Sequence, residues 1–568
     1  MITNRLLTAY AVNLLVAAFS FFSLTAYGQT YAKPHDLPIS LSGNYGELRA
    51  THFHAGLDFR VGGVSGEPVK AAKDGYISRI SVSPTGYGNG IYITHNDGTM
   101  TVYGHLLSFS SKVQEWVRNM QYEAESFAVN LNPDPSLFPV KRGEQIGKAG
   151  NTGSSGGPHI HFEIRDTKSE VPLNPQIVAG YNIHDNITPT IERVSFYGIS
   201  GAESLPVTSF VKSFLPTEKI DVISVPDTFY IAVAGVDRMN GTGARLAIAK
   251  YAYYLDKEPL FTFNVDKIPF DKGRYVNSIV EYPQKVNFKR NMVKSWVEPG
   301  SALTTHIESR NNGLFVLSDD ALHTVTVELS DYAGNISKRS FSVKRNSSLK
   351  PKTYDSLAIA SGKMMPWFLP NIFEKGSLKV TLPVGSLYRS ILFYADSVST
   401  VNSQFPVWKI FNENTPIHSG AEISLKVTIL ENVKERAYIA KVDEKGKLSY
   451  RGGKWMGDRL SATLGEFGTY TVAIDTVPPV VKINMAEGAN ISSASTIVVT
   501  LYDEISGISS INATVDGVWV VPQYDPKSRK VTLLLDSKRV PKGGKKDLLL
   551  TVTDGRGNST IIKRGFIW

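Results

Sequence analysis

Two histidines, His159 and His161, stand two residues apart in the segment GGPHIHFEIR. The segment alternates apolar and polar residues and is rich in β-branched and aromatic side chains, which is typical of a strand. Residues i and i+2 of a strand point to the same face, so both imidazoles are expected to project together, opposite Ile160 and Phe162. Paired imidazoles can bind a metal ion, but an isolated His-x-His is also common on an ordinary polar sheet face. The pair therefore needs further ligands before it indicates a metal site.

Two other segments carry the residues that such a site needs. HFHAGLDFR contains His54 and Asp58, spaced as His-x-x-x-Asp, and TVYGHL contains His105. Imidazoles and one carboxylate from three separate segments make a donor set that zinc accepts, and a catalytic zinc uses three protein ligands and leaves a position for water. Cysteine is absent, so disulfides and thiolate ligands are excluded and any metal must be held by nitrogen and oxygen donors. The sequence thus favours a zinc site built from distant segments.

Histidines are concentrated in the first part of the chain. Seven of the eleven lie between His35 and His161. A lone histidine is usually structural, so the scattered remainder is expected to have no role in chemistry: His184, His306, His323 and His418. The distribution separates a front end, residues 29 to about 180, which carries the candidate site residues, from a longer remainder without such a cluster.

Several Gly-rich segments link these histidines in a fixed order, and their short alternating stretches predict strands of an antiparallel sheet joined by Gly and Asp-Gly turns. Between HFHAGLDFR and PHIHF come GEPVKAAKDG, GYGNGIYITHNDG, YGHL and GEQIGKAGNTGSSGGP. In this order the set resembles the M23 family of lysostaphin-type, or LytM-like, zinc endopeptidases, which cut peptide cross-links of bacterial peptidoglycan. The resemblance covers about residues 45–178. It implies an antiparallel-sheet peptidase domain at residues 29–182.

The family motifs can be carried over residue by residue. They imply that His54, Asp58 and His161 bind Zn²⁺, and that His105 and His159 are catalytic histidines that do not bind the metal. The implied reaction is attack of a zinc-activated water on the scissile carbonyl, with the two free histidines as acid–base and oxyanion stabiliser. Which histidine takes which task stays open. The implied partners are peptidoglycan stem peptides and their cross-links.

Three nearby residues compete for these roles. His52 forms a second His-x-His with His54, but its spacing to Asp58 is two residues too long for the motif, so a place at the rim is expected. His95, in the turn ITHNDG, is expected to be structural. Glu163 is not part of a His-Glu-x-x-His motif, so we expect it to support a metal ligand rather than to act as a general base.

One departure from the family pattern follows His105. The link to VKRGEQIG holds about twenty extra residues, an insertion at about 111–137 that contains the only convincing helical pattern, SKVQEWVRNMQYEAESFAVNL. Its apolar stripe can simply pack on the sheet, or the insertion can form a wall or lid of the substrate groove.

The rest of the chain is expected to be nearly all β. The segments that begin at Phe229 and at Ser495 have similar sequence patterns. Each is followed by a predicted pair of strands with Asp-x-x-Gly-Asn at the turn between them. Two copies of one Ig-like β-sandwich module are the simplest account, at 186–347 and 477–568, with a β-rich module at 352–475 between them. The fold class is therefore mainly β: an antiparallel peptidase domain followed by an array of sandwich modules.

Composition restricts the cellular setting. The chain has 568 residues and 42% hydrophobic residues, which is ordinary for several globular domains. Net charge is +9, but Lys and Arg are scattered, so a nucleic-acid partner is not favoured. Residues 1–28 read as a secretory signal peptide, with an uncleaved membrane anchor as the alternative, and no second span follows. We expect an exported protein of the periplasm, cell envelope or medium, with no membrane span once the signal is removed.

Two other functions remain open at this stage. The front end could be a non-catalytic cell-wall-binding or regulatory domain. Alternatively, the β modules could do the main work as a structural or adhesion array that binds cell-envelope partners.

Overall fold

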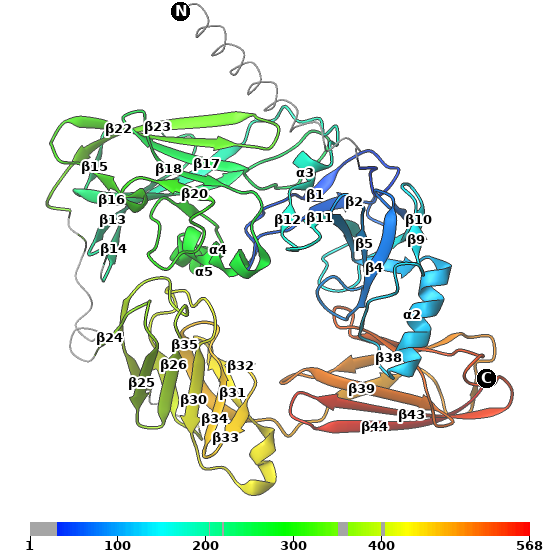
Figure 1. The fold of residues 1–568 in the computed structure, drawn as a ribbon. Helices are drawn as coiled ribbons and strands as arrows, with labels where there is room; N and C mark the ends of the chain where they lie inside the picture. Colours follow the sequence, from blue (N-terminus) through cyan, green and yellow to red (C-terminus); the bar gives the residue numbers. More distant parts are fainter. Residues whose placement is uncertain (1–30, 204, 219–220, 350, 352–361, 399–403) are drawn as a thin grey trace, which may run out of the picture.

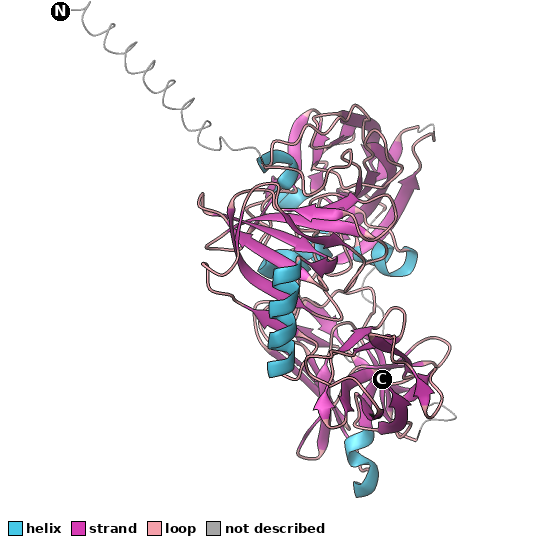
Figure 2. Ribbon diagram, turned by 90° about the vertical axis from the view of Figure 1, so that its right-hand side faces the viewer, coloured by secondary structure: helices cyan, strands magenta, loops and turns pink. Residues whose placement is uncertain are grey.

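The computed structural model describes residues 31–568 apart from 204, 219–220, 350, 352–361 and 399–403. The predicted signal peptide lies outside the described residues, as does the predicted start of the β-rich module at residue 352. Strands dominate the described chain, and helices are few and mostly short (Figures 1 and 2). Among the described residues, no helix is both long and apolar enough to cross a membrane.

The front end is built on one large sheet with the strand order β1-β2-β11-β6-β5-β4-β8. Its strand pairs are antiparallel, as expected from the alternating pattern and the Gly turns. The short strands β9 and β12 pair with β4 and β11, and β3, β10 and β7 form a second small sheet. The bounds are β1 Leu41–Gly43, β2 Leu57–Arg60, β3 Pro68–Lys70, β4 Gly75–Val82, β5 Gly90–Thr94, β6 Thr99–Gly104, β7 Leu106–Phe109, β8 Val129–Leu131, β9 Pro139–Val140, β10 Gln145–Ala149, β11 His159–Asp166, β12 Pro172–Leu173 and helix α3 Pro175–Val178.

The predicted helix is present as α2 (Ser111–Glu123). Val113 and Val117, four residues apart and therefore on one face, are buried in the core of the front end. The apolar stripe thus packs on the sheet. The segment after the helix is not a free loop, because it includes β8, whose residues Asn130 and Leu131 pair with Ser81 and Ile80 of β4.

Three further β units follow, coloured green, yellow and orange to red in Figure 1. The first has two sheets, β14-β13-β16-β19 and β15-β23-β22-β17-β18-β20, that share one core. Its elements are β13 Thr190–Ser200, β14 Val207–Phe214, β15 Ile223–Val225, β16 Thr228–Val236, β17 Lys250–Leu255, β18 Glu258–Asn264, a 3-10 helix Phe270–Tyr275, α4 Val276–Ile279, α5 Tyr282–Phe288, β19 Val293–Lys294, β20 Ile307–Ser309, a 3-10 turn Asn311–Gly313, β21 Phe315–Val316, β22 Leu322–Ser330 and β23 Ile336–Arg345.

The middle unit packs two five-stranded sheets around its own core, in the orders β25-β26-β30-β34-β33 and β28-β29-β35-β31-β32. Its elements are β24 Lys363–Met365, β25 Asn371–Lys375, β26 Leu378–Leu382, β27 Ile391–Phe393, β28 Ala395–Val398, β29 Val407–Ile410, β30 Glu422–Lys426, a 3-10 helix Glu431–Arg436, β31 Ala437–Val442, β32 Leu448–Tyr450, β33 Lys454–Met456, β34 Arg459–Thr463 and β35 Gly468–Ile474.

The last unit repeats the topology of the first. Its sheet β37-β44-β43-β39-β40 has the order of β15-β23-β22-β17-β18, and in both the first strand pairs with the second in parallel. The internal repeat read from the sequence therefore corresponds to a repeated strand order. The elements are β36 Val480–Ile483, β37 Ala489–Asn490, β38 Thr496–Tyr502, β39 Ile508–Val515, β40 Val518–Trp519, β41 Pro522–Asp525, β42 Lys530–Leu534, β43 Lys545–Asp554 and β44 Ser559–Ile567.

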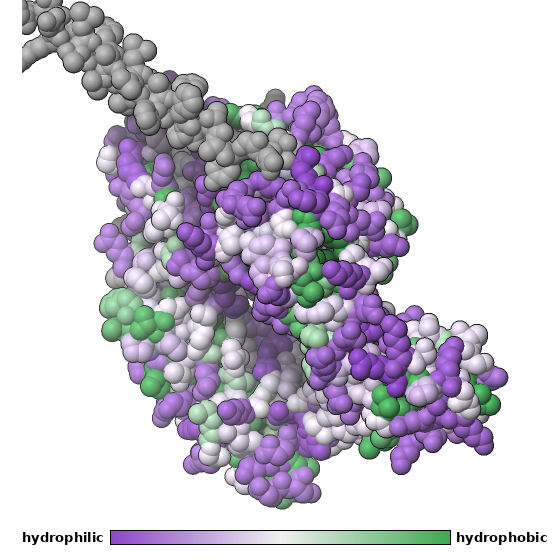
Figure 3. All heavy atoms as spheres, turned by 45° about the vertical axis from the view of Figure 1, so that its right-hand side comes forward, coloured by the Kyte–Doolittle hydropathy of each residue, from purple (hydrophilic) through white to green (hydrophobic). Residues whose placement is uncertain are grey.

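The last unit folds back against the inserted helix of the front end (Figure 1). Trp519 meets Tyr122 of α2 edge to face at 5.7 Å between ring centroids, and Phe127 packs on the same apolar cluster. Lys538 pairs with Glu115 of α2 at 2.8 Å. The insertion is thus a docking platform for a unit almost 400 residues away in sequence, a role that the apolar stripe did not indicate. The outer surface in Figure 3 is mostly hydrophilic, with scattered apolar patches and a hollow near its middle.

Candidate metal centre

Strand pairing brings the predicted ligands together. β2 and β11 are neighbours in the large sheet, and Asp58 lies directly opposite His161 in their register. His54 precedes β2 by three residues, in a segment whose backbone is tied to Gly46 and Glu47. His105 lies between β6 and β7, directly after the end of β6, and β6 is the neighbour of β11 in the sheet. The backbone of His105 has a left-handed φ of 61°.

Three donor atoms converge in a buried space. Oδ1 of Asp58 lies 3.1 Å from Nε2 of His54 and 2.9 Å from Nδ1 of His161, and the two nitrogens are 3.0 Å apart. All three residues are buried. They form a group that could hold a metal ion, and neither His159 nor His52 belongs to it.

The outer partners of this group fix which atoms face inward. Nδ1 of His54 donates a hydrogen bond to the carbonyl oxygen of Asn44 at 2.7 Å, and Nε2 of His161 donates to Oε1 of Glu163 at 2.8 Å. A neutral imidazole carries one N–H, so the inward nitrogens of both rings present lone pairs. Two nitrogen lone pairs and a carboxylate oxygen repel one another unless a cation lies between them. The arrangement therefore fits a divalent cation that prefers nitrogen and oxygen donors, as zinc does.

Electrostatics indicate the same need for positive charge. Burial alone would lower the pKa of His161, but the hydrogen bonds that its ring donates to the carboxylates of Asp58 and Glu163 outweigh burial and raise the pKa to about 9. Burial raises the pKa of Asp58, yet the neighbouring imidazoles of His54 and His159 and that of His161 hold it well below its usual value. Without a metal ion, only protons can balance the negative charge of the carboxylates. A proton on His161 then takes the position that the metal ion would fill.

Glu163 supports His161 within a network of buried polar groups. β11 is regular from His159 to Asp166, so Glu163 and Arg165 lie on the same face as the two histidines. Glu163 also accepts hydrogen bonds from the Tyr87 hydroxyl at 2.5 Å and from Nε of Arg165 at 2.7 Å. The expectation that Glu163 supports a ligand agrees with this contact.

Sequence reasoning missed three members of the surroundings. Arg165 could have been found from its place two residues beyond Glu163 in the same strand. Tyr87, in the GYGNG loop, had no local signal that it reaches Glu163. Arg49 was also missed, although its guanidinium donates to Oδ2 of Asp58 at 3.2 Å and leaves Oδ1 to the inward group.

His105 and His159 lie beside the three-residue group. Their ring centroids are 4.8 Å apart, and the His105 ring is 5.8 Å from that of His161. Nδ1 of His105 donates to the Thr152 carbonyl at 2.8 Å, and Nδ1 of His159 donates to the Gly157 carbonyl at 2.8 Å. Each ring is therefore held in the tautomer that leaves Nε2 unprotonated, and Nε2 of His159 lies 3.4 Å from Oδ1 of Asp58.

Two further front-end histidines, His52 and His95, lie apart from this group. His52 is exposed, with its Nδ1 3.4 Å from the Thr51 hydroxyl. His95 is buried, and its two nitrogens are satisfied by the Asp74 carbonyl at 2.8 Å and the Thr101 hydroxyl at 2.9 Å. His95 thus has the bonding of a structural histidine, as expected.

The last β unit reaches the rim of the site. The ammonium group of Lys527 donates to the carbonyl oxygens of Asn151 and Ser155, on the loop that leads into β11. The same loop supplies the Thr152 carbonyl that holds His105. A pocket of about 250 Å³ lies between this loop and residues 523–525 of the last unit.

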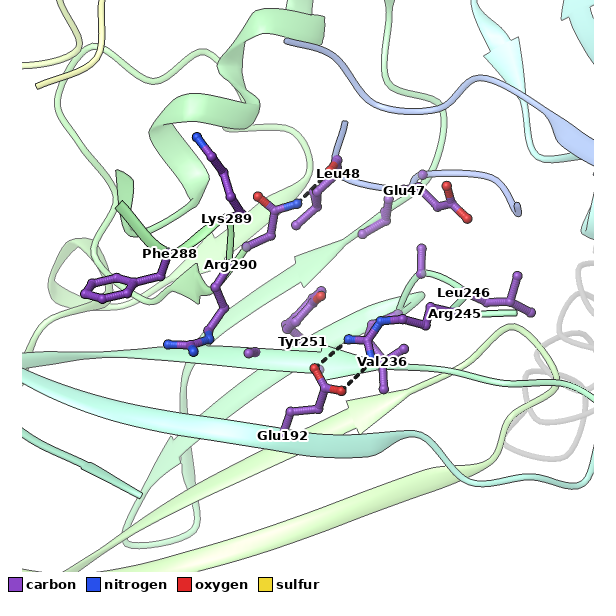
Figure 4. A pocket seen from close by; sticks show the side chains of 17 residues that line it. Glu47, Leu48, Glu192, Val236, Arg245, Leu246, Tyr251, Phe288, Lys289 and Arg290 are labelled. Atoms are coloured by element: carbon purple, nitrogen blue, oxygen red, sulfur yellow. Dashed lines mark hydrogen bonds and ion pairs between the residues drawn. The ribbon is translucent and has the colours of Figure 1, made fainter. Parts of the chain in front are cut away.

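A larger pocket, of about 430 Å³, lies between residues 46–48 and the first β unit (Figure 4). Two of its lining residues, Arg245 and Glu192, form a bidentate ion pair, with both N–O distances 2.7 Å. None of His54, Asp58 or His161 lines this pocket. It is therefore not the space in which the convergent donors would act.

Comparison with known proteins divides the chain in the same way as the fold. Residues 52–137 and 138–175 match the family described as Peptidase family M23, and residues 362–475 match the Zu5-like domain. Similar curated proteins include the DD-carboxypeptidase/endopeptidase Mpg of Neisseria meningitidis serogroup B, 35% identical over 23% of this chain and 24% of Mpg. Lysostaphin of Staphylococcus simulans is 31% identical over 24% of each chain, and the cell division protein DipM of Caulobacter vibrioides is 31% identical over 22% of this chain and 17% of DipM.

Some solved structures are also similar to part of the chain. The catalytic domain of lysostaphin from Staphylococcus simulans is 27% identical and covers 27% of this chain and 91% of its own, with a TM-score of 0.18. The catalytic domain of the M23 protein EnpA from Enterococcus faecalis is 24% identical and covers 26% of this chain and 98% of its own, with a TM-score of 0.20. The chain spans about a quarter or less of the length of the curated relatives named above.

Proposed function

Because residues 52–175 form a Peptidase family M23 domain, we propose that this protein is an exported zinc endopeptidase that hydrolyses peptide cross-links of bacterial peptidoglycan. The observation that carries the proposal is the convergence of two imidazole lone pairs and one carboxylate oxygen in a buried space, within 3.1 Å of one another. The curated relatives named as endopeptidases and as lysostaphin support the substrate class.

In this proposal His54, Asp58 and His161 hold zinc, and the Asn44 carbonyl and Glu163 orient the two imidazoles. A zinc ion in such a site lowers the pKa of water and polarises a carbonyl group. The fold keeps the two ligand nitrogens in place, because the opposite nitrogen of each ring donates a hydrogen bond that fixes the orientation of the ring.

His105 and His159 are the proposed proton-transfer residues. Burial, together with the nearby imidazoles of His161 and His159, lowers the pKa of His105 to about 3, so this ring is neutral near pH 7. With Nδ1–H donated to a backbone carbonyl, each ring offers Nε2 as the atom that accepts a proton and later returns it. Once protonated, the same Nε2–H is the donor that stabilises an oxyanion or protonates a leaving amine.

We also propose that the last β unit forms one wall of the substrate groove. Its support is the contact of Lys527 with the Asn151–Ser155 loop and the pocket shared by that loop and residues 523–525. In this proposal α2 anchors the wall rather than serving as a mobile lid.

The test is digestion of purified peptidoglycan with the zinc-loaded protein, followed by mass spectrometry of the released muropeptides. New amino and carboxyl ends within cross-linking peptides are expected, and the His105→Ala protein is the matched control that keeps the metal ligands. Zinc binding without any cleavage of peptidoglycan or of soluble cross-linked peptides would favour the non-catalytic alternative. Absence of zinc binding would remove the proposal altogether.

A further inference from the structure

Three carboxylates meet where the first β unit begins. Asp185 lies in the segment that joins the front end to this unit, Asp237 directly follows β16, and Asp331 directly follows β22. One oxygen of each lies within 4.8 Å of the others. Asp237 and Asp331 are 3% and 5% exposed, so water does little to separate their charges.

The three carboxylates have no cationic partner. Among the described residues, none of them forms an ion pair with a Lys, Arg or His side chain within 4.0 Å. Oδ1 of Asp237 is buried and accepts no hydrogen bond from any described residue. A buried carboxylate oxygen without a donor, on a side chain that lies beside two further carboxylates, indicates a missing positive partner.

The same arrangement recurs in the last β unit. Asp475 lies in the segment that leads into this unit, Asp503 directly follows β38, and Asp554 is the last residue of β43. Their oxygens also lie within 4.8 Å of one another, and Asp475 and Asp554 are 0% and 1% exposed. The two trios occupy equivalent positions, because β16 and β22 correspond to β38 and β43 in the repeated topology.

The hydrogen bonds that hold the leading segment match in the two units. The side-chain amide of Asn335 donates to the Asp185 carbonyl at 3.3 Å, as that of Asn558 does to the Asp475 carbonyl at 3.0 Å. Oδ1 of Asp185 and of Asp475 each accept from the backbone N–H two residues later, at 3.1 Å. The same two kinds of hydrogen bond therefore hold the leading segment in each of the two units.

Turn chemistry explains only part of this arrangement. Asp331 and Asp554 accept the hydrogen bonds of their Asp-x-x-Gly-Asn turns from Asn335 and Asn558. A turn needs neither the carboxylate of Asp237 nor that of Asp185 beside it. Bringing three carboxylates together in two separate places costs free energy unless a cation joins them.

We propose that each of these two β units binds one Ca²⁺ at its aspartate trio, through Asp185, Asp237 and Asp331 in the first and Asp475, Asp503 and Asp554 in the last. Carboxylate oxygens are hard donors, and Ca²⁺ accepts six to eight oxygen ligands in irregular geometry, completed by backbone carbonyls and water. The ion joins the incoming segment to two strand ends. It therefore stiffens the junction between each unit and the domain before it.

The test measures calcium bound per chain by the full-length, zinc-loaded protein after exchange into calcium-free buffer, by equilibrium dialysis up to about 5 mM Ca²⁺, above the range typical of extracellular calcium modules. Two Ca²⁺ per chain are expected, with a rise in the unfolding temperature. Asp237→Asn and Asp503→Asn should each remove one Ca²⁺. Asp221→Asn, at an exposed aspartate outside both trios, should keep both.

Stability in the absence of calcium separates loss of binding from loss of folding. Asp237→Asn removes a buried charge, so without calcium this variant should unfold at the temperature of the unmodified chain or above it. No bound calcium in the unmodified chain, or two Ca²⁺ retained by both variants, would overturn the proposal. A single bound ion that one variant removes would refute the site in the other unit.

Discussion

Nε2 of His54 and Nδ1 of His161 lie 3.0 Å apart, and the opposite nitrogen of each ring is already used in a hydrogen bond. Neither inward nitrogen therefore carries a proton when the rings are neutral, and Oδ1 of Asp58 lies within 3.1 Å of both. A proton or a metal ion must lie between these three acceptors to keep them together in a buried space, which is the behaviour of a preformed metal site.

The first prediction concerns the ligands themselves. His54→Ala, Asp58→Ala and His161→Ala should each abolish stoichiometric zinc binding and peptidoglycan hydrolysis, because three donors are needed to leave one position open for chemistry. Zinc per chain measured by atomic emission gives the answer directly. His95→Gln, at a buried histidine outside the group, is the matched control and should keep one zinc. Full zinc occupancy in any of the three ligand variants would contradict the assignment.

The second prediction separates proton transfer from metal binding. His105→Ala and His159→Ala should keep one zinc per chain and lose turnover by roughly 10²–10⁴-fold, the usual contribution of a positioned acid or base. The measurement is kcat on a soluble cross-linked peptide alongside zinc content. If either change removes the metal, that residue is a ligand and the proposed division of tasks is wrong.

The third prediction tests the support given by Glu163. Glu163→Gln keeps the size of the side chain but removes the charge that strengthens His161 as a ligand, so zinc affinity should fall by about 10–100-fold. Competition with a chelator of known affinity measures the change. Tyr87→Phe, which removes one hydrogen bond to Glu163 and one from Arg165 but keeps the Glu163 charge, should have a smaller effect on the same scale. Equal affinity in Glu163→Gln and the unmodified chain would show that the contact only packs the core.

Local patterns were enough to predict much of the front end. Alternation and Gly turns predicted the strands β4, β5, β6, β10 and β11, and period-2 geometry put His159 and His161 on one face. The helix α2 followed from the spacing of Val113 and Val117, which the structure buries. These features depend on residues close together in the chain.

Contacts between distant segments could not be predicted in this way. Tyr87 reaches Glu163 across 76 residues, and Trp519 reaches Tyr122 across almost 400. The Asp-x-x-Gly-Asn motif predicted a turn, and the turn is present, but the pattern did not reveal that Asp185 and Asp237 lie beside Asp331. Side chains of this kind become neighbours only through sheet order and domain packing.

The fourth prediction tests the wall formed by the last β unit. Trp519→Ala removes the aromatic contact with Tyr122 and opens the apolar cluster that includes Phe127, so the unit should separate from α2. We expect the Michaelis constant for intact peptidoglycan to rise, while kcat on a short soluble peptide stays the same. Tyr502→Ala, at a partly exposed aromatic of the same unit, is the control. Unchanged kinetics on both substrates, with separation shown by faster proteolysis of α2, would leave the docking a purely structural contact.

The fifth prediction concerns acid stability and His35. This side chain is 1% exposed, it packs edge-on against Phe59 with ring centroids 5.3 Å apart, and neither ring nitrogen has a hydrogen-bond partner among the described residues. Burial, aided by the charge of Lys33 and opposed by Asp36, lowers its pKa from 6.5 to about 4. The folded protein therefore resists a proton that the unfolded chain accepts.

The sign of the pH effect follows from that difference. Above pH 6.5 His35 is neutral in both states and contributes no pH dependence. As pH falls from 6.5 toward 4, the unfolded chain is protonated first, so the free energy of unfolding decreases, by about 2–3 kcal/mol at the lower limit.

His35→Phe removes the titrating group and both unpaired nitrogens while keeping a ring against Phe59. This variant should be at least as stable near pH 7.5 and should lose less stability than the unmodified chain between about pH 6.5 and 4.5. Urea unfolding at several pH values measures both slopes, and His184→Phe, at an exposed histidine, should leave the slope unchanged. Parallel slopes in the His35→Phe and unmodified chains would mean that His35 takes up its proton in the folded state, and the acid sensitivity would then have to arise from other buried histidines.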